Sequence, residues 1–305
     1  MPKNDELSTY LSNKYEYYVT GEENANLVLY GSTDENGIVV PRFLAMQLGI
    51  NYNPYIEDIQ EIKNKIQIKY KKGAKLKLLL QCGRRFALMG RIDYLLICYP
   101  SLPQYNSKWE ESVKEYEMDK VKFYIYTPRN DERKLINGKM LREKICEKLN
   151  NKSRTIGTKK SKNKSLADYF HLWSGENLPS SIVKLDIDGL FLKENDQILV
   201  EIKRSNIPPI PKWHPYKDDA PDFRLLDAFA KKIDAQFWLL HHDGKNECSA
   251  ETIISFYDID CYEESQDVFL KYRKSIDMLK LEGENSLETI IKDKGFLHTI
   301  FQPRS

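Results

Sequence analysis

Cysteine pairs, long apolar runs and an export signal are all missing from this sequence. The five cysteines are odd in number and include no Cys-x-x-Cys pair, so we expect neither a disulfide framework nor a cysteine-based zinc site, and a reducing cytoplasm is the expected location. No stretch approaches the roughly 18 consecutive apolar residues of a membrane span. The N-terminus lacks the apolar segment of a secretory signal, and we therefore expect no membrane partner.

Motifs for nucleotide hydrolysis and for histidine-based metal chemistry are missing too. Neither GxGxxG nor GxxxxGK[ST] occurs, which predicts that the chain uses no nucleotide cofactor. The five histidines have no metal-ligand spacing, and the adjacent His241 and His242 would point to opposite faces of a strand. This pattern disfavours a nuclease of the HNH type.

The composition is that of a folded chain, long enough for one large domain or two ordinary ones. Of the 305 residues, 41% are hydrophobic and 30% are charged, which provides for a buried core and argues against a disordered chain. Short segments with helical and with strand spacing alternate along the sequence. We therefore expect a mixed α/β (α+β) fold.

Positive charge is concentrated in two stretches, although the net charge is only +2. Residues 62–92, the first basic region, contain ten Lys and Arg and no acidic residue. Residues 120–165, the second basic region, contain 15 Lys and Arg against four acidic residues. Such segregation favours surfaces that meet a phosphate backbone. The alternative is that both are solvated, lysine-rich faces with no partner.

Residues 1–150 are predicted to form a basic α/β region that recognises the substrate. Strands are expected at 27–31, 37–40, 92–98 and 121–126, and helices at 43–48, 55–66, 109–117 and 141–149. A hairpin is also expected, with strands at 66–70 and 76–81, and alternation along it would place a basic stripe on one face.

A polar, basic segment follows at 151–164, and we expect a linker or a loop that orders on DNA. The second predicted domain covers 165–305. Its expected helices are 166–173, 222–233 and 266–281, and its expected strands are 182–192, 197–203, 236–241 and 252–257.

Two predicted strands of the second domain, 182–192 and 197–203, hold the side chains with the clearest chemical pattern. Asp186 and Asp188 are two residues apart on the first run, and Glu201 and Lys203 are two apart on the second, so each pair shares one face of a strand. A hairpin of these runs would bring Asp188, Glu201 and Lys203 together. The two carboxylates would form a hard-oxygen site for Mg²⁺ or Mn²⁺, with Asp186 as an alternative or second ligand. The competing interpretation is a surface hairpin with cross-strand ion pairs.

These residues resemble the motif of the PD-(D/E)xK nuclease superfamily, in which an acidic residue on one strand is followed by Glu/Asp-x-Lys on the next. Here the residues are Asp188 and Glu201–Ile202–Lys203, and Ile187 stands where the motif has proline. The resemblance covers roughly 165–260 and implies a restriction-endonuclease-like mixed sheet flanked by helices. It also implies a metal held by Asp188, Glu201 and the Ile202 carbonyl, an activated water, and in-line attack that leaves a 5′-phosphate.

The tripeptide acidic-x-Lys also occurs at three other places, namely Glu61–Lys63, Glu132–Lys134 and Asp243–Lys245. Glu132 even lies 13 residues after Asp119, which is the separation of Asp188 and Glu201. We prefer Glu201 because it ends an apolar strand whose predicted partner offers a carboxylate on the matching face. Glu132 is instead expected in a turn.

Together, the resemblance and the basic regions predict a Mg²⁺-dependent DNA endonuclease in which Mn²⁺ can substitute. The simplest form is a type II restriction enzyme that acts on double-stranded DNA as a homodimer. Two alternatives stay open: a structure-specific repair, recombination or phage-defence nuclease of the same superfamily, and a non-catalytic nucleic-acid-binding protein. The predicted phosphate contacts are Lys69, Lys71, Arg84, Arg85, Arg204 and Lys212.

Overall fold

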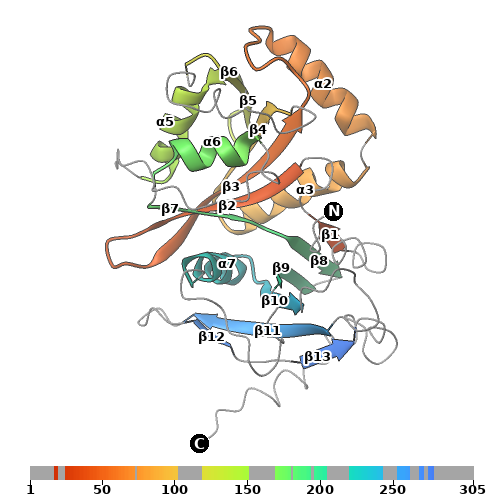
Figure 1. The fold of residues 1–305 in the computed structure, drawn as a ribbon, viewed down its shortest axis with the longest axis vertical. Helices are drawn as coiled ribbons and strands as arrows, with labels where there is room; N and C mark the ends of the chain where they lie inside the picture. Colours follow the sequence, from red (N-terminus) through yellow and green to blue (C-terminus); the bar gives the residue numbers. More distant parts are fainter. Residues whose placement is uncertain are drawn as a thin grey trace, which may run out of the picture. The chain divides into compact units, whose positions relative to one another are not determined.

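The computed structural model divides the chain into two compact units, which we describe separately (Figure 1). The first unit is Thr20–Asp186, and the second unit is Ile187–Ser305 together with Met1–Val19. The residues that the structure describes are 17–19, 25–72, 74–101, 119–150, 169–179, 181–193, 196–204, 220–242, 253–261, 268–270 and 274–277.

The first unit contains a mixed sheet in the order β6-β5-β4-β3-β2-β7. Its strands are β2 (Ala25–Thr33), β3 (Val39–Ile50), β4 (Asp93–Pro100), β5 (Lys122–Thr127), β6 (Glu132–Asn137) and β7 (Ile182–Asp186). Its helices are α2 (Ile59–Lys72), α3 (Ala74–Met89), α5 (Gly138–Lys148) and α6 (Tyr169–Asn177). Strands β3 and β4 are parallel and joined through α2 and α3, and the other neighbours are antiparallel.

One face of this sheet is covered by α5 and α6 (Figure 1). The α6 residues Phe170 and Trp173 are completely buried, and the Trp173 ring lies 5.1 Å from the ring of Phe123 on β5. From α5, Leu141 and Ile145 join the same hydrophobic cluster. Aromatic rings bury large apolar areas, and this cluster therefore holds both helices on the sheet.

The opposite face is covered by α3, with α2 beside it. Gly83 allows the close approach, since a Cβ atom there would lie 2.9 Å from the Leu27 Cδ1 atom of β2 and 3.1 Å from a ring atom of Tyr94 on β4. Because strand residues alternate between faces, Leu27 points to α3 while its neighbour Val28 belongs to the cluster under α5 and α6. The first unit therefore has three layers, with the sheet between two helical layers.

The second unit contains a second mixed sheet, in the order β1-β8-β9-β10-β11-β12, with β13 also paired to β11. Its strands are β1 (Tyr17–Val19), β8 (Gly189–Lys193), β9 (Asp196–Arg204), β10 (Gln236–His242), β11 (Ile253–Cys261), β12 (Val268–Leu270) and β13 (Lys274–Asp277). Strands β8 and β9 form an antiparallel hairpin, and β9 connects through α7 (Ala220–Lys232) to the parallel strand β10. Both units bear out the predicted mixed α/β class.

Several predicted elements are wrong, and the reasons differ. Residues 43–48, predicted as a helix, belong to β3, which is buried on both faces and so lacks the polar alternation of a half-exposed strand. Residues 66–81, predicted as a β-hairpin, belong instead to helices α2 and α3. Over a longer window the apolar residues recur every 3.6 residues, as in a helix, and this pattern outweighs the short alternation of lysine and apolar residues. Residues 266–281, predicted as a helix, contain β12 and β13, since both pair with β11.

The unit boundary also differs from the predicted one. The second domain is predicted to begin at residue 165, but α6 and β7 belong to the first unit. The predicted strand at 182–192 is two strands in different sheets, with Ile187 and Asp188 between them. The predicted helix at 109–117, the linker at 151–164 and Lys212 lie outside the described residues.

Candidate metal and active site

Asp188 and the Glu201–Ile202–Lys203 segment lie side by side in the second unit. The antiparallel register of β8 and β9 pairs Gly189 with Val200, so Asp188 stands where β8 begins. Its carboxylate Oδ2 accepts a hydrogen bond from the backbone N–H of Ile202 at 2.7 Å. The side chain thus fills the acceptor position that a longer β8 would supply, next to the residue that follows Glu201.

The Ile202 carbonyl points toward the same side of β9 as Asp188. Within a strand, the N–H and C=O of one residue point to the same neighbouring strand, and the next residue points the other way. Since the Ile202 N–H donates to Asp188, the Ile202 carbonyl is directed to that edge, away from β10. The backbone therefore offers an oxygen beside the Asp188 carboxylate.

Glu201 points to the face of the sheet that α7 covers. The β9–β10 register pairs Leu199 with Phe237 and Glu201 with Leu239, and residues paired in register share a face. The ring of Phe237 lies 6.3 Å from Phe223 of α7, so this is the α7 face. Glu201 is only 4% exposed. A carboxylate is seldom buried so deeply unless it is paired or binds a metal.

Lys203 follows Glu201 by two residues, so its Cβ starts on the same face of β9. The side chains of Lys203 and Arg204 lie outside what the structure describes. Their predicted roles at the site and at DNA stay predictions.

Asp186 is not a neighbour of Asp188 along one strand, contrary to the prediction. It ends β7 opposite Val28 and belongs to the first unit, whereas Asp188 belongs to the second. Across the described part of the chain, no group of three or more His, Cys, Asp or Glu side chains is arranged to hold a metal ion. The oxygen groups that stand along this part of β9 are the Asp188 and Glu201 carboxylates and the Ile202 carbonyl, a type of donor that hard cations prefer.

The predicted DNA contacts of the first basic region have different surroundings. Lys69 donates to the Gly49 carbonyl at 3.1 Å and is half-buried. Lys71 of α2 and Arg84 and Arg85 of α3 are exposed, and of these three only Lys71 falls within the hairpin predicted at 66–81. Sequence reasoning missed that Lys77 lies on the same side of α3 as Arg84, which its helical spacing of seven residues would have indicated.

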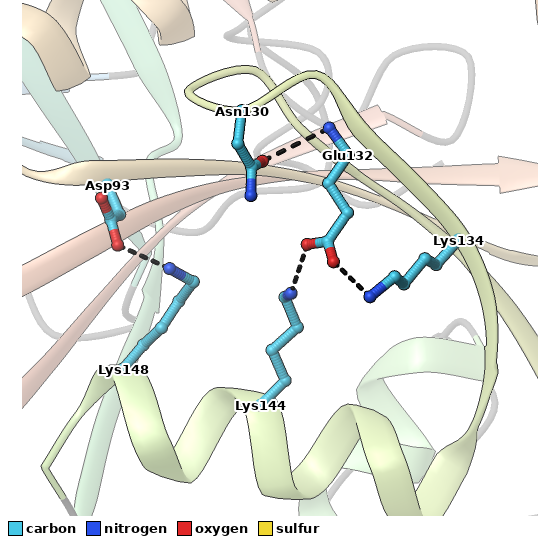
Figure 2. Close-up of polar contacts among 6 residues, drawn as sticks. All are labelled: Asp93, Asn130, Glu132, Lys134, Lys144 and Lys148. Carbon is cyan, nitrogen blue, oxygen red and sulfur yellow. Dashed lines mark hydrogen bonds and ion pairs between the residues drawn. The ribbon is translucent and has the colours of Figure 1, made fainter.

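The competing motif Glu132–Arg133–Lys134 forms an ion-pair cluster in the first unit (Figure 2). Glu132 begins β6 rather than lying in a turn. Its carboxylate binds the ammonium groups of Lys134, two residues on, and of Lys144 on α5, the latter at 3.0 Å. Both carboxylate oxygens thus have cationic partners, which explains this acidic-x-Lys motif as a link between β6 and α5.

A second ion pair ties α5 to β4 in the same region (Figure 2). Lys148 Nζ lies 2.5 Å from Asp93 Oδ2, and Arg129 contacts the other oxygen at 3.5 Å. The hydrogen bond from Lys148 lowers the pKa of Asp93. Several cations of the second basic region are therefore neutralised within the protein.

The cluster around Glu132 predicts acid sensitivity of the first unit. Hydrogen bonds from Lys134 and then Lys144 lower the pKa of Glu132 to about 2, from an ordinary value of 4.5. Because the folded-state pKa is depressed, the contribution of Glu132 to stability is full above pH 4.5 and is lost as the pH falls toward 2. We expect Glu132→Gln to remove this part of the pH dependence, measured by urea unfolding followed by circular dichroism between pH 6 and pH 2.5.

Glu143→Gln, which changes an exposed glutamate of α5 outside the cluster, serves as the control and should follow the wild type. If Glu132→Gln also lost stability as steeply as the wild type below pH 4.5, the ion pairs of Glu132 would carry no pH-dependent stability.

Comparisons with other proteins add no constraint to this site. No family model, curated protein or solved structure matches the chain. Among the helices that the structure describes, none has the length and apolar character needed to cross a bilayer. The chemistry of the site is therefore argued from its own residues.

Proposed function

We propose that the chain is a Mg²⁺-dependent DNA endonuclease with its active site at Asp188, Glu201 and Lys203. The observation that carries the proposal is the 2.7 Å hydrogen bond from the Ile202 N–H to Asp188, which joins one carboxylate to the strand that bears the other. A surface hairpin would not require Glu201 to be buried in an otherwise apolar stretch of β9. The resemblance to the PD-(D/E)xK superfamily is consistent with the hairpin β8–β9 and the parallel β9-α7-β10 connection that follows it.

Each residue would have a distinct role in this chemistry. Asp188 and Glu201 would hold the cation, with the Ile202 carbonyl as a third oxygen donor. Bound Mg²⁺ supplies charge stabilisation at the phosphate and acidifies water. The Lys203 ammonium would orient the attacking water and offset phosphate charge. The water oxygen would join phosphorus as the bond to the 3′-oxygen breaks. One water proton would go to the 3′-oxygen and the other to solvent, which gives a 5′-phosphate and a 3′-hydroxyl.

Among nucleases, we favour a sequence-specific restriction enzyme that works in the cytoplasm. We expect it to act as a homodimer, because cutting both strands of a palindromic site calls for two active sites related by symmetry. Purified protein should convert plasmid DNA to discrete fragments with Mg²⁺ or Mn²⁺ and leave it intact with EDTA. Sequencing the fragment ends reports the target and the cut position. Smears, or cleavage of branched or single-stranded DNA alone, would point to the repair or phage-defence alternative.

One observation favours a second candidate, a nucleic-acid-binding protein without catalysis. The Asp188 carboxylate caps the backbone of β9, and such a cap is a structural role that needs no metal. Binding of DNA without cleavage in either Mg²⁺ or Mn²⁺ would support this candidate and refute the nuclease.

A further inference from the structure

Helix α3 presents a row of four long polar side chains and one leucine on the side away from its sheet. Lys77, Gln81, Arg84, Arg85 and Leu88 are all exposed, and Leu88 is 71% exposed. Their spacing of three and four residues places them along one helix face. We call these five residues the α3 stripe.

The opposite side of α3 is fixed to the first unit. Leu76, Leu79 and Phe86 are buried, and Gly83 lets the helix pack against β2 and β4. A helix anchored in this way holds its exposed side chains on a rigid support, so a ligand of the α3 stripe would not have to order the backbone first.

The cations of the α3 stripe are not neutralised within the described part of the chain. Neither Arg84 nor Arg85 makes an ion pair or hydrogen bond there, and residues 62–92 contain no acidic side chain. The Lys77 ammonium lies over the Tyr70 ring at 5.8 Å, a contact that leaves its N–H donors directed to solvent or to an anion.

The second basic region differs in this respect. Lys134 and Lys144 bind Glu132, and Lys148 binds Asp93 (Figure 2). Arg133 pairs with Asp131 at 2.7 Å. Two stretches with similar excess charge in the sequence thus differ among the described residues: five cations of the second basic region are paired with Asp93, Asp131 or Glu132, whereas Arg84 and Arg85 of the α3 stripe have no such partner.

We propose that the α3 stripe binds the phosphate backbone of double-stranded DNA. The proposal rests on the proposed function for the class of partner, but it concerns a surface of the first unit and not the catalytic residues. From Lys77 to Leu88 the helix rises about 16 Å, which is enough to contact several phosphates of a duplex that carries one charge per roughly 1.7 Å.

The chemistry of the stripe favours duplex DNA over other nucleic acids. Proteins that bind single strands stack bases on exposed aromatic rings, and the α3 stripe contains none. The deep, narrow major groove of an RNA duplex does not admit side chains from a helix, whereas the major groove of DNA accommodates one.

The test is a binding measurement in EDTA, so that cleavage cannot interfere. Fluorescence anisotropy with a labelled DNA duplex is recorded between 50 and 200 mM salt, for the wild type and for the triple variant Lys77→Ala, Arg84→Ala, Arg85→Ala. We expect the triple variant to bind at least about tenfold more weakly. The logarithm of the association constant falls with the logarithm of the salt concentration, and this slope should become shallower by about 0.9 for each phosphate that the variant no longer neutralises. For the three cations removed, the slope should change by up to about 2.7.

The matched control is Arg129→Ala, Lys134→Ala, Lys144→Ala, which removes the same formal charge from the second basic region. We expect it to change affinity and slope much less, because these cations are paired with Asp93 and Glu132. Thermal unfolding checks that both triple variants are folded. Equal losses of affinity in the two, tighter binding of a single strand than of the duplex, or no duplex binding by the wild type would each overturn the proposal. The plasmid assay tests the nuclease separately.

Discussion

Replacing Glu201 by glutamine is expected to reduce metal-dependent DNA cleavage by about a thousandfold or more. The substitution keeps the size of the side chain and removes one of the two carboxylates that we propose to hold the divalent ion. Charge stabilisation by a bound metal contributes several kcal/mol to such reactions, and each 1.4 kcal/mol corresponds to about tenfold in rate. The measurement is the initial rate of plasmid cleavage in Mg²⁺, with circular dichroism to check the fold.

Two further variants make this result specific. Asp188→Asn retains an oxygen that can accept the hydrogen bond from the Ile202 N–H, so it keeps this contact with β9 and removes only the negative charge. Its cleavage rate should fall as much as that of Glu201→Gln. Glu132→Gln changes the same tripeptide pattern in the first unit, and its cleavage rate should equal that of the wild type. Wild-type rates in both Glu201→Gln and Asp188→Asn would mean that these carboxylates are structural.

Replacing Trp173 by alanine is expected to lower the free energy of unfolding of the first unit by about 3–5 kcal/mol. Trp173 has no exposed surface, and its ring lies 5.1 Å from Phe123 and 5.2 Å from Phe170. Truncation would leave a cavity between α6 and the sheet that the surrounding aromatic rings cannot fill without moving. Urea unfolding followed by far-UV circular dichroism measures the change.

Met140→Ala provides the comparison for Trp173→Ala. Met140 lies on α5 in the same unit but is 50% exposed, and a surface truncation of this kind changes stability by about 0.5 kcal/mol or less. A decrease below about 1 kcal/mol in Trp173→Ala would contradict the account of α6 as a helix held by its aromatic face.

The sequence is sufficient to predict the elements whose spacing is unambiguous over their whole length. Helix α7, strand β9 and strand β10 lie within a few residues of their predicted positions, because each has a clear apolar period and polar ends. The prediction for β3 is wrong because burial on both faces removes the alternation that identifies a strand. The predictions for α2 and α3 are wrong in part because short stretches of alternating Lys and apolar residues fit either period.

The candidate site is predictable only in part. The two-residue spacing of Glu201 and Lys203 and the apolar flank of β9 identify the strand, and the hydrogen bond from Ile202 to Asp188 agrees with the predicted pairing. The separation of Asp186 from Asp188 is not predictable, because a run of alternating residues does not show that its two halves pair with different sheets. Nor does sequence spacing show which basic residues are already paired, as Glu132 and its lysines demonstrate.

The most direct measurement of the central claim is a titration with Mn²⁺ followed by electron paramagnetic resonance. We predict that the wild type binds Mn²⁺ at a site that is abolished in both Asp188→Asn and Glu201→Gln and retained in Glu132→Gln. Unchanged Mn²⁺ binding in Asp188→Asn and Glu201→Gln, or no binding by the folded wild type, would contradict the assignment of a metal-dependent active site to β8 and β9.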